Sequence, residues 1–278
     1  MRRALVAAVA AVAAGALTCP GGHTSCPSGD ACCVGVAPDA YAVEGGYGCM
    51  PPGTANYTGC AGGGTFPDGC CCAPGPSAVD ATGPNVLVVG DSVSAGYLPH
   101  LRAALGAGVN VQHGPDNLSG GYADGAQYGA LCAGYFARTP LGALPRWDVV
   151  TFNFGLHDQD PHESVESYAD NLRAIATTLA ATGAPLLLFT TTMPGGSAEP
   201  LNSTAERRVQ QLNAAALGVA AEFNVPAVDL YGAMQACAAA CASCQPHCDS
   251  DGYEFLVQQA IAPAVKAALG MPAGMPRA

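Results

Sequence analysis

The residues best placed to do chemistry stand at the end of an apolar run, where residues 86–92 read VLVVGDS. A run of this kind predicts a buried strand, and Gly90, Asp91 and Ser92 then form the turn that leaves it. Gly90 allows the backbone to turn tightly, and Asp91 can fix the turn by hydrogen bonds to the backbone. Ser92 is then an exposed candidate nucleophile. The alternative is an ordinary strand-to-turn junction, because these residue types are common in turns.

A nucleophilic serine needs a general base, and His247 is the candidate. Residues 245–253 read QPHCDSDGY and lie just before the last predicted helix. A loop at that place could bring the imidazole over Ser92. The alternative is a histidine with a structural role, since most histidines are not catalytic bases.

Two further stretches offer donors for the oxyanion that forms in acyl transfer. Residues 113–121 read HGPDNLSGG, a glycine-rich loop that can present backbone N–H groups. Residues 153–158 read NFGLHD and place Asn153, His157 and Asp158 after a predicted strand. Taken singly, the first is only a flexible loop and the second only a loop before a helix.

A parallel sheet is needed to bring these stretches together. After residue 84 apolar runs alternate with helical patterns, which predicts a mainly parallel sheet covered by helices on both faces. The carboxyl ends of such strands share one edge, where ligands bind in open α/β sheets. The predicted strands are 86–89, 109–112, 147–154, 185–190 and 226–230, and the predicted helices are 98–105, 124–137, 165–181, 205–223 and 252–269.

Four stretches together resemble, in type, order and spacing, the four blocks of the SGNH, or GDSL, hydrolases. They are Gly90-Asp91-Ser92, the glycine loop with Asn117 and Gly120, Gly155-Leu156-His157-Asp158, and His247. Residues 190–194 and 213–216 also resemble one branch of that superfamily. The resemblance covers about residues 85–269. It implies a flavodoxin-like three-layer α/β/α domain and a carboxylic ester hydrolase that uses neither a metal nor an organic cofactor.

The resemblance also implies roles for individual residues. Ser92 is the nucleophile, His247 is the base, and the backbone N–H groups of Ser92 and Gly120 belong to the oxyanion hole. In the family an asparagine of the third block supplies another donor, and this sequence has His157 at that position. Asn153 is the alternative side-chain donor, and we favour it over His157.

A second departure from the family concerns the orientation of the histidine. The family has an aspartate three residues before its histidine, and this sequence has Cys244 there. Asp249 could take over that role, a backbone carbonyl could complete a Ser–His dyad, or the enzyme could be impaired. Loss of an oriented carboxylate can cost up to ~10⁴ in turnover in a serine triad. An Asp249 carboxylate within hydrogen-bond reach of His247 would support an esterase, and one that points to solvent would weaken that interpretation relative to a non-catalytic extracellular binding or matrix protein with a degenerate hydrolase domain.

The amino-terminal part of the chain indicates export. Residues 1–18 combine a basic start with a short apolar stretch, which predicts a signal peptide and is too short to span a membrane. Residues 19–72 hold nine of the fourteen cysteines and must be held by covalent links. They resemble granulin-like modules, and the alternative is another small disulfide-stabilised appendage. Residues 73–84 predict a linker, and residues 85–270 the hydrolase domain.

Five cysteines remain in the hydrolase domain. They are Cys132, Cys237, Cys241, Cys244 and Cys248. In an exported chain the last four predict disulfides around the histidine loop, and the alternative is a metal site with His247 as a ligand. Because both parts of the chain hold an odd number of cysteines, we expect one disulfide between them.

Net charge and short sequence motifs restrict the classes of partner that this chain could have. Without Arg2 and Arg3 the chain has 8 basic and 21 acidic residues, a net charge of about −13. This charge excludes an electrostatic footprint for nucleic acid or anionic membranes. Asn56, Asn117 and Asn202 stand in glycosylation sequons. We therefore expect a secreted glycoprotein that acts on an ester substrate, with O-acetyl groups on carbohydrate favoured by the resemblance and by export.

Overall fold

The computed structural model describes most of the predicted hydrolase domain. The described residues there are 82–115, 125–138, 145–159, 164–195, 203–237, 240–244 and 246–272, with 76 and 79–80 before them. Before residue 76 six short strands are described, five of them in the cysteine-rich segment. Asn117 and Gly120 lie outside the described residues, as do the sequons at Asn56 and Asn202.

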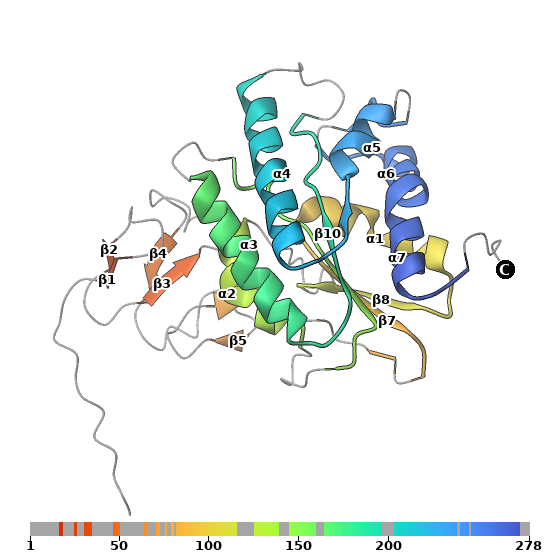
Figure 1. The fold of residues 1–278 in the computed structure, drawn as a ribbon, viewed down its shortest axis with the longest axis horizontal. Coiled ribbons are helices and arrows are strands. Elements are labelled where there is room, and N and C mark those ends of the chain that lie inside the picture. The colour runs from red at the N-terminus through yellow and green to blue at the C-terminus, as the bar shows by residue number, and fades with distance from the viewer. Residues whose placement is uncertain are drawn as a thin grey trace, which may run out of the picture.

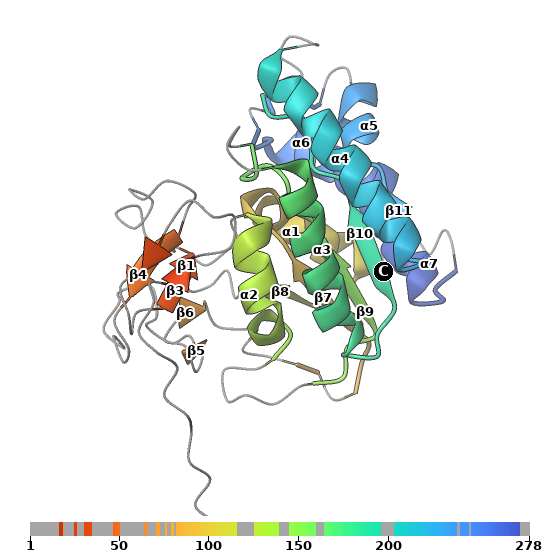
Figure 2. The same cartoon turned by 60° about the vertical axis from the view of Figure 1, so that its left-hand side comes forward.

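Five parallel strands form one sheet with the order β11-β10-β9-β7-β8 (Figure 1; β9 and β11 are labelled in Figure 2). They are β7 (Asn85–Val89), β8 (Asn110–Gly114), β9 (Val149–Phe152), β10 (Leu186–Phe189) and β11 (Ala227–Val228). Strand β7 lies between β8 and β9, so the turn that follows it opens near the middle of the carboxyl edge. All five predicted strands are found, within a few residues at each end.

Helices cover both faces of the sheet, which gives three layers (Figure 2). One face carries α2 (Ala126–Phe136), α3 (Val165–Ala180) and α4 (Thr204–Glu222). The other carries α1 (Ser92–Leu105), α5 (Leu230–Ala236), α6 (Ser250–Leu256) and α7 (Ala262–Ala268), with the π-helical turn η5 (Val257–Ile261) joining the last two. The predicted three-layer α/β fold is confirmed.

Strand β7 shows how the core forms. Its residues alternate between two clusters, with Leu87 and Val89 facing α2, α3 and α4, and Val86 and Val88 facing α1 and the carboxyl-terminal helices. All four side chains are fully buried. Complete burial of a side chain of this size contributes about 1.5–3 kcal/mol, so the apolar run itself fixes β7 in the centre of the domain.

The six amino-terminal strands pair as three short antiparallel ladders. They are β1 (Leu17–Thr18) with β2 (Ser25–Cys26), β3 (Ala31–Val34) with β4 (Tyr47–Met50), and β5 (Gly64–Thr65) with β6 (Cys71–Cys72). Strand β1 falls on the last two residues of the predicted signal peptide, and β6 contacts α2. The granulin-like interpretation and the domain boundaries stay predictions.

Two features connect the predicted linker and Cys132 to the rest of the molecule. Val79 packs on the α2–α4 side of the core, and the backbone N–H of Asp80 donates to Asn85 Oδ1 at 2.9 Å. Cys132 of α2 is disulfide-bonded, and its partner is not one of the other four cysteines of the hydrolase domain, which pair with one another. The pairing of the other four cysteines with one another agrees with the expected disulfide between the cysteine-rich segment and the hydrolase domain.

No helix among the described residues is long and apolar enough to cross a membrane.

Candidate active site

Ser92 and His247 meet at the carboxyl edge of the sheet. Ser92 is the first residue of α1, immediately after the turn that leaves β7, and is half-buried. His247 is exposed and lies two residues before the cap of α6. Its Nε2 is 2.7 Å from Ser92 Oγ, although the two residues are 155 positions apart in the chain. This is hydrogen-bond distance, so the imidazole can accept the hydroxyl proton directly.

The contact between α1 and α6 holds this pair in register. The two helices pack together near their amino-terminal ends, where Gly96 of α1 faces Tyr253 of α6. A Cβ at Gly96 would lie 2.6 Å from Cε2 of the Tyr253 ring, closer than real atoms approach. A glycine therefore allows the close approach that brings the two helix starts, and with them Ser92 and His247, together.

Asp91 and Gly90 shape the turn before the nucleophile. Asp91 is the N-cap of α1, with extended backbone, and its Oδ1 accepts a hydrogen bond from Val93 N at 3.0 Å. A Cβ at Gly90 would lie 2.7 Å from Ser94 Oγ and would also strike the Asn153 side chain. The turn therefore needs a capping residue at position 91 and a glycine at position 90, as the residue types predicted.

Asp91 gives the turn an unusual electrostatic setting. Its side chain is fully buried, and burial raises the pKa of the carboxyl. Positive charge at His157, the backbone N–H groups of Val93 and Ser94, and positive charge at His247 all act against that rise. When it is ionised, Asp91 attracts the imidazolium that His247 becomes on accepting a proton.

Asn153 and His157 stand at different depths. Asn153 follows β9 and is buried, its N–H donates to Val89 O at 3.1 Å, and its side chain lies against Gly90. His157 is exposed. Between them Gly155 has φ +134°, a conformation that L side chains rarely adopt. The structure therefore places the Asn153 amide beside the nucleophile turn and His157 at the rim.

Asp158 anchors the start of α2. It is buried, and its Oδ1 accepts from Ala126 N at 2.7 Å, at the start of α2. The Arg208 guanidinium donates to the Asp158 carbonyl at 3.2 Å. Gly125 lies against the same carboxylate, which leaves little room for a side chain at that position. Asp158 thus fixes the chain at residues 125–126, and Asn117 and Gly120 lie outside the described part.

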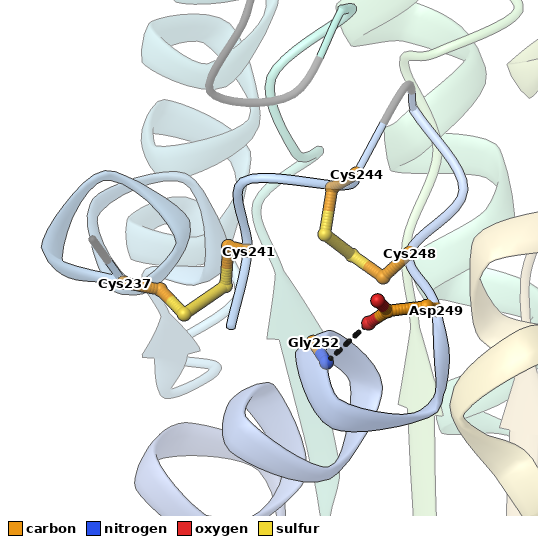
Figure 3. The surroundings of a disulfide bond; sticks show 6 residues. All are labelled: Cys237, Cys241, Cys244, Cys248, Asp249 and Gly252. Atoms are coloured by element: carbon orange, nitrogen blue, oxygen red, sulfur yellow. Dashed lines mark hydrogen bonds between the residues drawn. A yellow bond between two sulfur atoms is a disulfide. The ribbon is translucent and has the colours of Figure 1, made fainter. Parts of the chain in front are cut away.

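Asp249 serves as the N-cap of α6. Its Oδ1 accepts from Gly252 N at 3.0 Å (Figure 3). Hydrogen bonds from the Gly252 N–H, the Ser243 side chain and the Asp251 N–H hold the pKa of its carboxyl below the ordinary value. Among the described residues, the ring of His247 is hydrogen-bonded to Ser92 and not to Asp249, so the structure does not place Asp249 in the orienting role that the sequence left open for it.

The four cysteines around the histidine loop form two disulfides, Cys237–Cys241 and Cys244–Cys248 (Figure 3). A sulfur in a disulfide has no thiolate to offer a metal, so these cysteines do not form the alternative site with His247 as a ligand. No cluster of three or more metal-binding side chains occurs in the described part of the chain. The second disulfide encloses His247 in its ring.

Sequence reasoning gave no role to a buried pair beneath the nucleophile turn. His113 Nε2 is 2.8 Å from Ser94 Oγ, and Ser94 Oγ is 2.6 Å from the Asp91 carbonyl oxygen. Both side chains are buried, so the pair ties the first turn of α1 to the end of β8. A polar residue two positions after the nucleophile and a histidine at the end of the second strand are the signals that could have indicated it.

The two stretches that resemble one branch of the superfamily are joined directly. Asn213 of α4 accepts from Thr191 N at 2.8 Å and donates to Thr191 O at 3.0 Å. Both residues are buried. One side-chain amide therefore satisfies both backbone groups of Thr191, and it fixes the chain just after β10 at the carboxyl edge.

Comparisons with known proteins agree with this architecture. The GDSL-like lipase/acylhydrolase family model matches residues 88–255, more than half of the chain. The chain therefore belongs to the GDSL-like lipase/acylhydrolase family and is a carboxylic ester hydrolase by class. Among curated proteins no match is found.

Solved structures share the fold at low sequence identity. An α/β hydrolase from the metagenome of Lake Arreo, Spain, is 19% identical, with a TM-score of 0.53 over 69% of this chain and 97% of that chain. An acetylxylan esterase from Geobacillus stearothermophilus is 16% identical, with a TM-score of 0.51 over 68% of this chain and 95% of that chain.

Proposed function

We propose that this protein is a secreted serine esterase in which Ser92 and His247 form a catalytic dyad. The observation that carries the proposal is the 2.7 Å contact between His247 Nε2 and Ser92 Oγ at the carboxyl edge of the sheet. An exposed imidazole and a half-buried hydroxyl also leave room for an ester to approach. Family membership supplies the reaction class.

The reaction follows from this geometry. Ser92 Oγ attacks the ester carbonyl carbon while His247 Nε2 takes the hydroxyl proton, and the carbonyl oxygen becomes an oxyanion. The imidazolium then gives its proton to the leaving alcohol as the C–O bond breaks. Water attacks the acyl-enzyme with His247 again as the base, and the imidazolium returns the proton to Ser92 Oγ as the acyl C–Oγ bond breaks and the acid leaves.

We assign the oxyanion to donors at the end of β7 and β9. The Ser92 N–H lies in the first turn of α1, where backbone donors point away from the helix and the helix dipole favours negative charge. Asn153 is the side-chain donor we favour over His157, because its buried amide stands beside the nucleophile turn, with Oδ1 against Gly90 and Nδ2 as the group that would donate. The N–H of Gly120 completes the set by family resemblance.

A Ser–His dyad is favoured over a Ser–His–Asp triad because Asp249 caps α6. Its carboxylate is bonded to the amino-terminal turn of α6. Among the described residues this carboxylate makes no hydrogen bond to His247, whereas a triad aspartate accepts one from the second ring nitrogen of the histidine.

The substrate we propose is an O-acetyl ester on carbohydrate. Two observations support this choice. A protein of the same fold is an acetylxylan esterase, and the predicted signal peptide with the cysteine-rich segment would bring the chain to extracellular polysaccharide. Secretion would also permit the two disulfides near His247 to form and persist.

The test is hydrolysis by full-length protein secreted from a eukaryotic host. Acetate release from acetylated xylan and p-nitrophenol release from its acetate are measured for wild type and Ser92→Ala, with circular dichroism to show that both are folded. We expect hydrolysis in wild type and its loss in the variant. Folded wild type without Ser92-dependent hydrolysis would instead favour a non-catalytic extracellular binding or matrix protein. Amino-terminal sequencing of the secreted chain tests the predicted cleavage near residue 18.

A further inference from the structure

His247 needs a means of support that its hydrogen bonds do not supply. A catalytic base works only if its ring stays within hydrogen-bond reach of the nucleophile. Among the described residues the ring bonds only to Ser92 itself, and the nearest acidic side chain in sequence, Asp249, caps α6. The ring is also exposed, so packing around it is slight.

The Cys244–Cys248 disulfide closes a covalent ring around this histidine. The ring spans residues 244–248 and is anchored at both ends. Cys244 is fully buried in the core beside α5 and α6, and Cys248 directly precedes the residue that caps α6. Figure 3 shows this disulfide above the amino-terminal turn of α6, next to the Asp249 carboxylate.

The first turn of α6 is built to receive the disulfide. A Cβ at Gly252 would lie 2.8 Å from the Cβ of Cys248 and 3.0 Å from Cys244 Sγ. Both cysteines therefore pack directly against Gly252, and a methyl group at that position would have no room. Because α6 packs on α1, the ring that holds His247 is tied to the helix that begins at Ser92.

We propose that the Cys244–Cys248 disulfide is the positioning element of His247. By tying Cys248 to the buried Cys244, it restricts the backbone next to His247 and keeps Nε2 over Ser92 Oγ without an orienting carboxylate. Pro246 restricts the same short segment further through its fixed φ. This inference rests on the proposed esterase function, because it concerns the base of that reaction.

The neighbouring disulfide provides a matched control. Cys237–Cys241 has the same sequence separation of four residues, but its ring contains no catalytic group. Both of its cysteines are buried, as is Cys244. Variants of the two bonds should therefore lose a similar amount of stability and differ in what happens to the base.

The experiment compares Cys244→Ala/Cys248→Ser with Cys237→Ala/Cys241→Ala in the full-length protein. Alanine at the buried positions avoids placing a hydroxyl in the core. For each we measure kcat and KM for p-nitrophenyl acetate, the melting temperature, and the rate at which a fluorophosphonate labels Ser92. We expect the first variant to lose at least tenfold in kcat and in labelling rate with KM within twofold, and the control to keep kcat within twofold.

Several outcomes would overturn the proposal. Folded Cys244→Ala/Cys248→Ser with kcat within twofold of wild type contradicts it, and so does an equal loss in both variants, which would show a merely structural role. If wild type itself has no Ser92-dependent activity, the proposed function fails first and the positioning role falls with it.

A second measurement uses the native chain, in case the first variant does not fold. A phosphine reductant and one water convert the disulfide to two thiols; the water supplies the two protons and the oxygen of the phosphine oxide that forms. Alkylation and peptide mass then give the fraction of Cys244–Cys248 that is reduced. We expect kcat to fall in proportion to that fraction and to return on reoxidation. Unchanged kcat with this bond reduced contradicts the proposal.

Discussion

Substitution of Asp249 separates a helix cap from a triad carboxylate. Its Oδ1 accepts from Gly252 N at 3.0 Å, and the same carboxyl interacts with Ser243 and the Asp251 N–H. Asparagine caps helices about as well as aspartate, so Asp249→Asn should melt within about 1 °C of wild type. Asp249→Ala removes the cap and should lower the melting temperature by about 2–4 °C.

The kcat of these variants distinguishes a helix cap from a triad carboxylate. In the dyad, Asp249→Asn keeps kcat within about threefold, whereas the same change in a triad carboxylate costs ~10⁴. The assay is p-nitrophenyl acetate hydrolysis with the melting temperature of each variant measured in parallel. A loss of about 10³ or more in folded Asp249→Asn would refute our account of the histidine loop.

The pH dependence of stability checks the same contact. The pKa of Asp249 is lowered by its hydrogen bonds in the folded state. Its contribution to stability is therefore fully present above the ordinary value of 3.8 and is lost as the pH falls through the lowered folded pKa. Acid unfolding of wild type should accordingly show a component that Asp249→Asn lacks, and identical acid profiles would contradict the assignment.

Three further predictions concern the nucleophile turn. Asn153→Ala should lower kcat by about 10²–10³, as expected for a lost oxyanion donor, while His157→Ala stays within about threefold; the reverse order would make His157 the donor. Gly96→Ala should cost about 1–3 kcal/mol of stability in urea unfolding and lower kcat, because a Cβ there would push α6 away from α1. Ser94→Ala should cost about 1–3 kcal/mol, because it removes a partner of buried His113; a neutral result by urea unfolding would contradict that role.

The sheet and the nucleophile turn could be predicted because their signals are local. Residues 86–89 are a short apolar run that only burial on both faces explains, and the turn residues Gly90 and Asp91 have backbone roles that follow from their chemistry. The contact between Ser92 and His247 follows less directly. It was expected only because parallel strands share one edge and family resemblance placed the histidine there.

The start of α1 and the whole of α5 were missed for different reasons. The sequence predicted a helix from residue 98, but α1 begins at Ser92 and continues through Pro99. The Asp91 cap and the burial of the first turns outweigh the hydrogen bond that proline cannot donate. Helix α5 has seven residues, too few for a clear period, and is fixed by the Asp229 cap to Gly232 N at 2.8 Å.

The role of Asp249 could not be read from the sequence. An aspartate two residues after a histidine and just before a helix suits both an N-cap and an orienting carboxylate. The structure distinguishes the two roles: α6 packs on α1, and the Oδ1 of Asp249 accepts a hydrogen bond from Gly252 N. The enclosure of His247 by a disulfide likewise depends on which cysteines pair, which spacing alone does not determine.

The measurement that tests the central claim most directly is fluorophosphonate labelling of the folded, oxidised protein, with the labelled peptide identified by mass spectrometry. Our account predicts one label, on Ser92, that is absent in Ser92→Ala and strongly slowed in His247→Ala. No labelling of Ser92 in protein shown to be folded, or equal labelling in His247→Ala, would contradict the claim that these two residues form an active dyad.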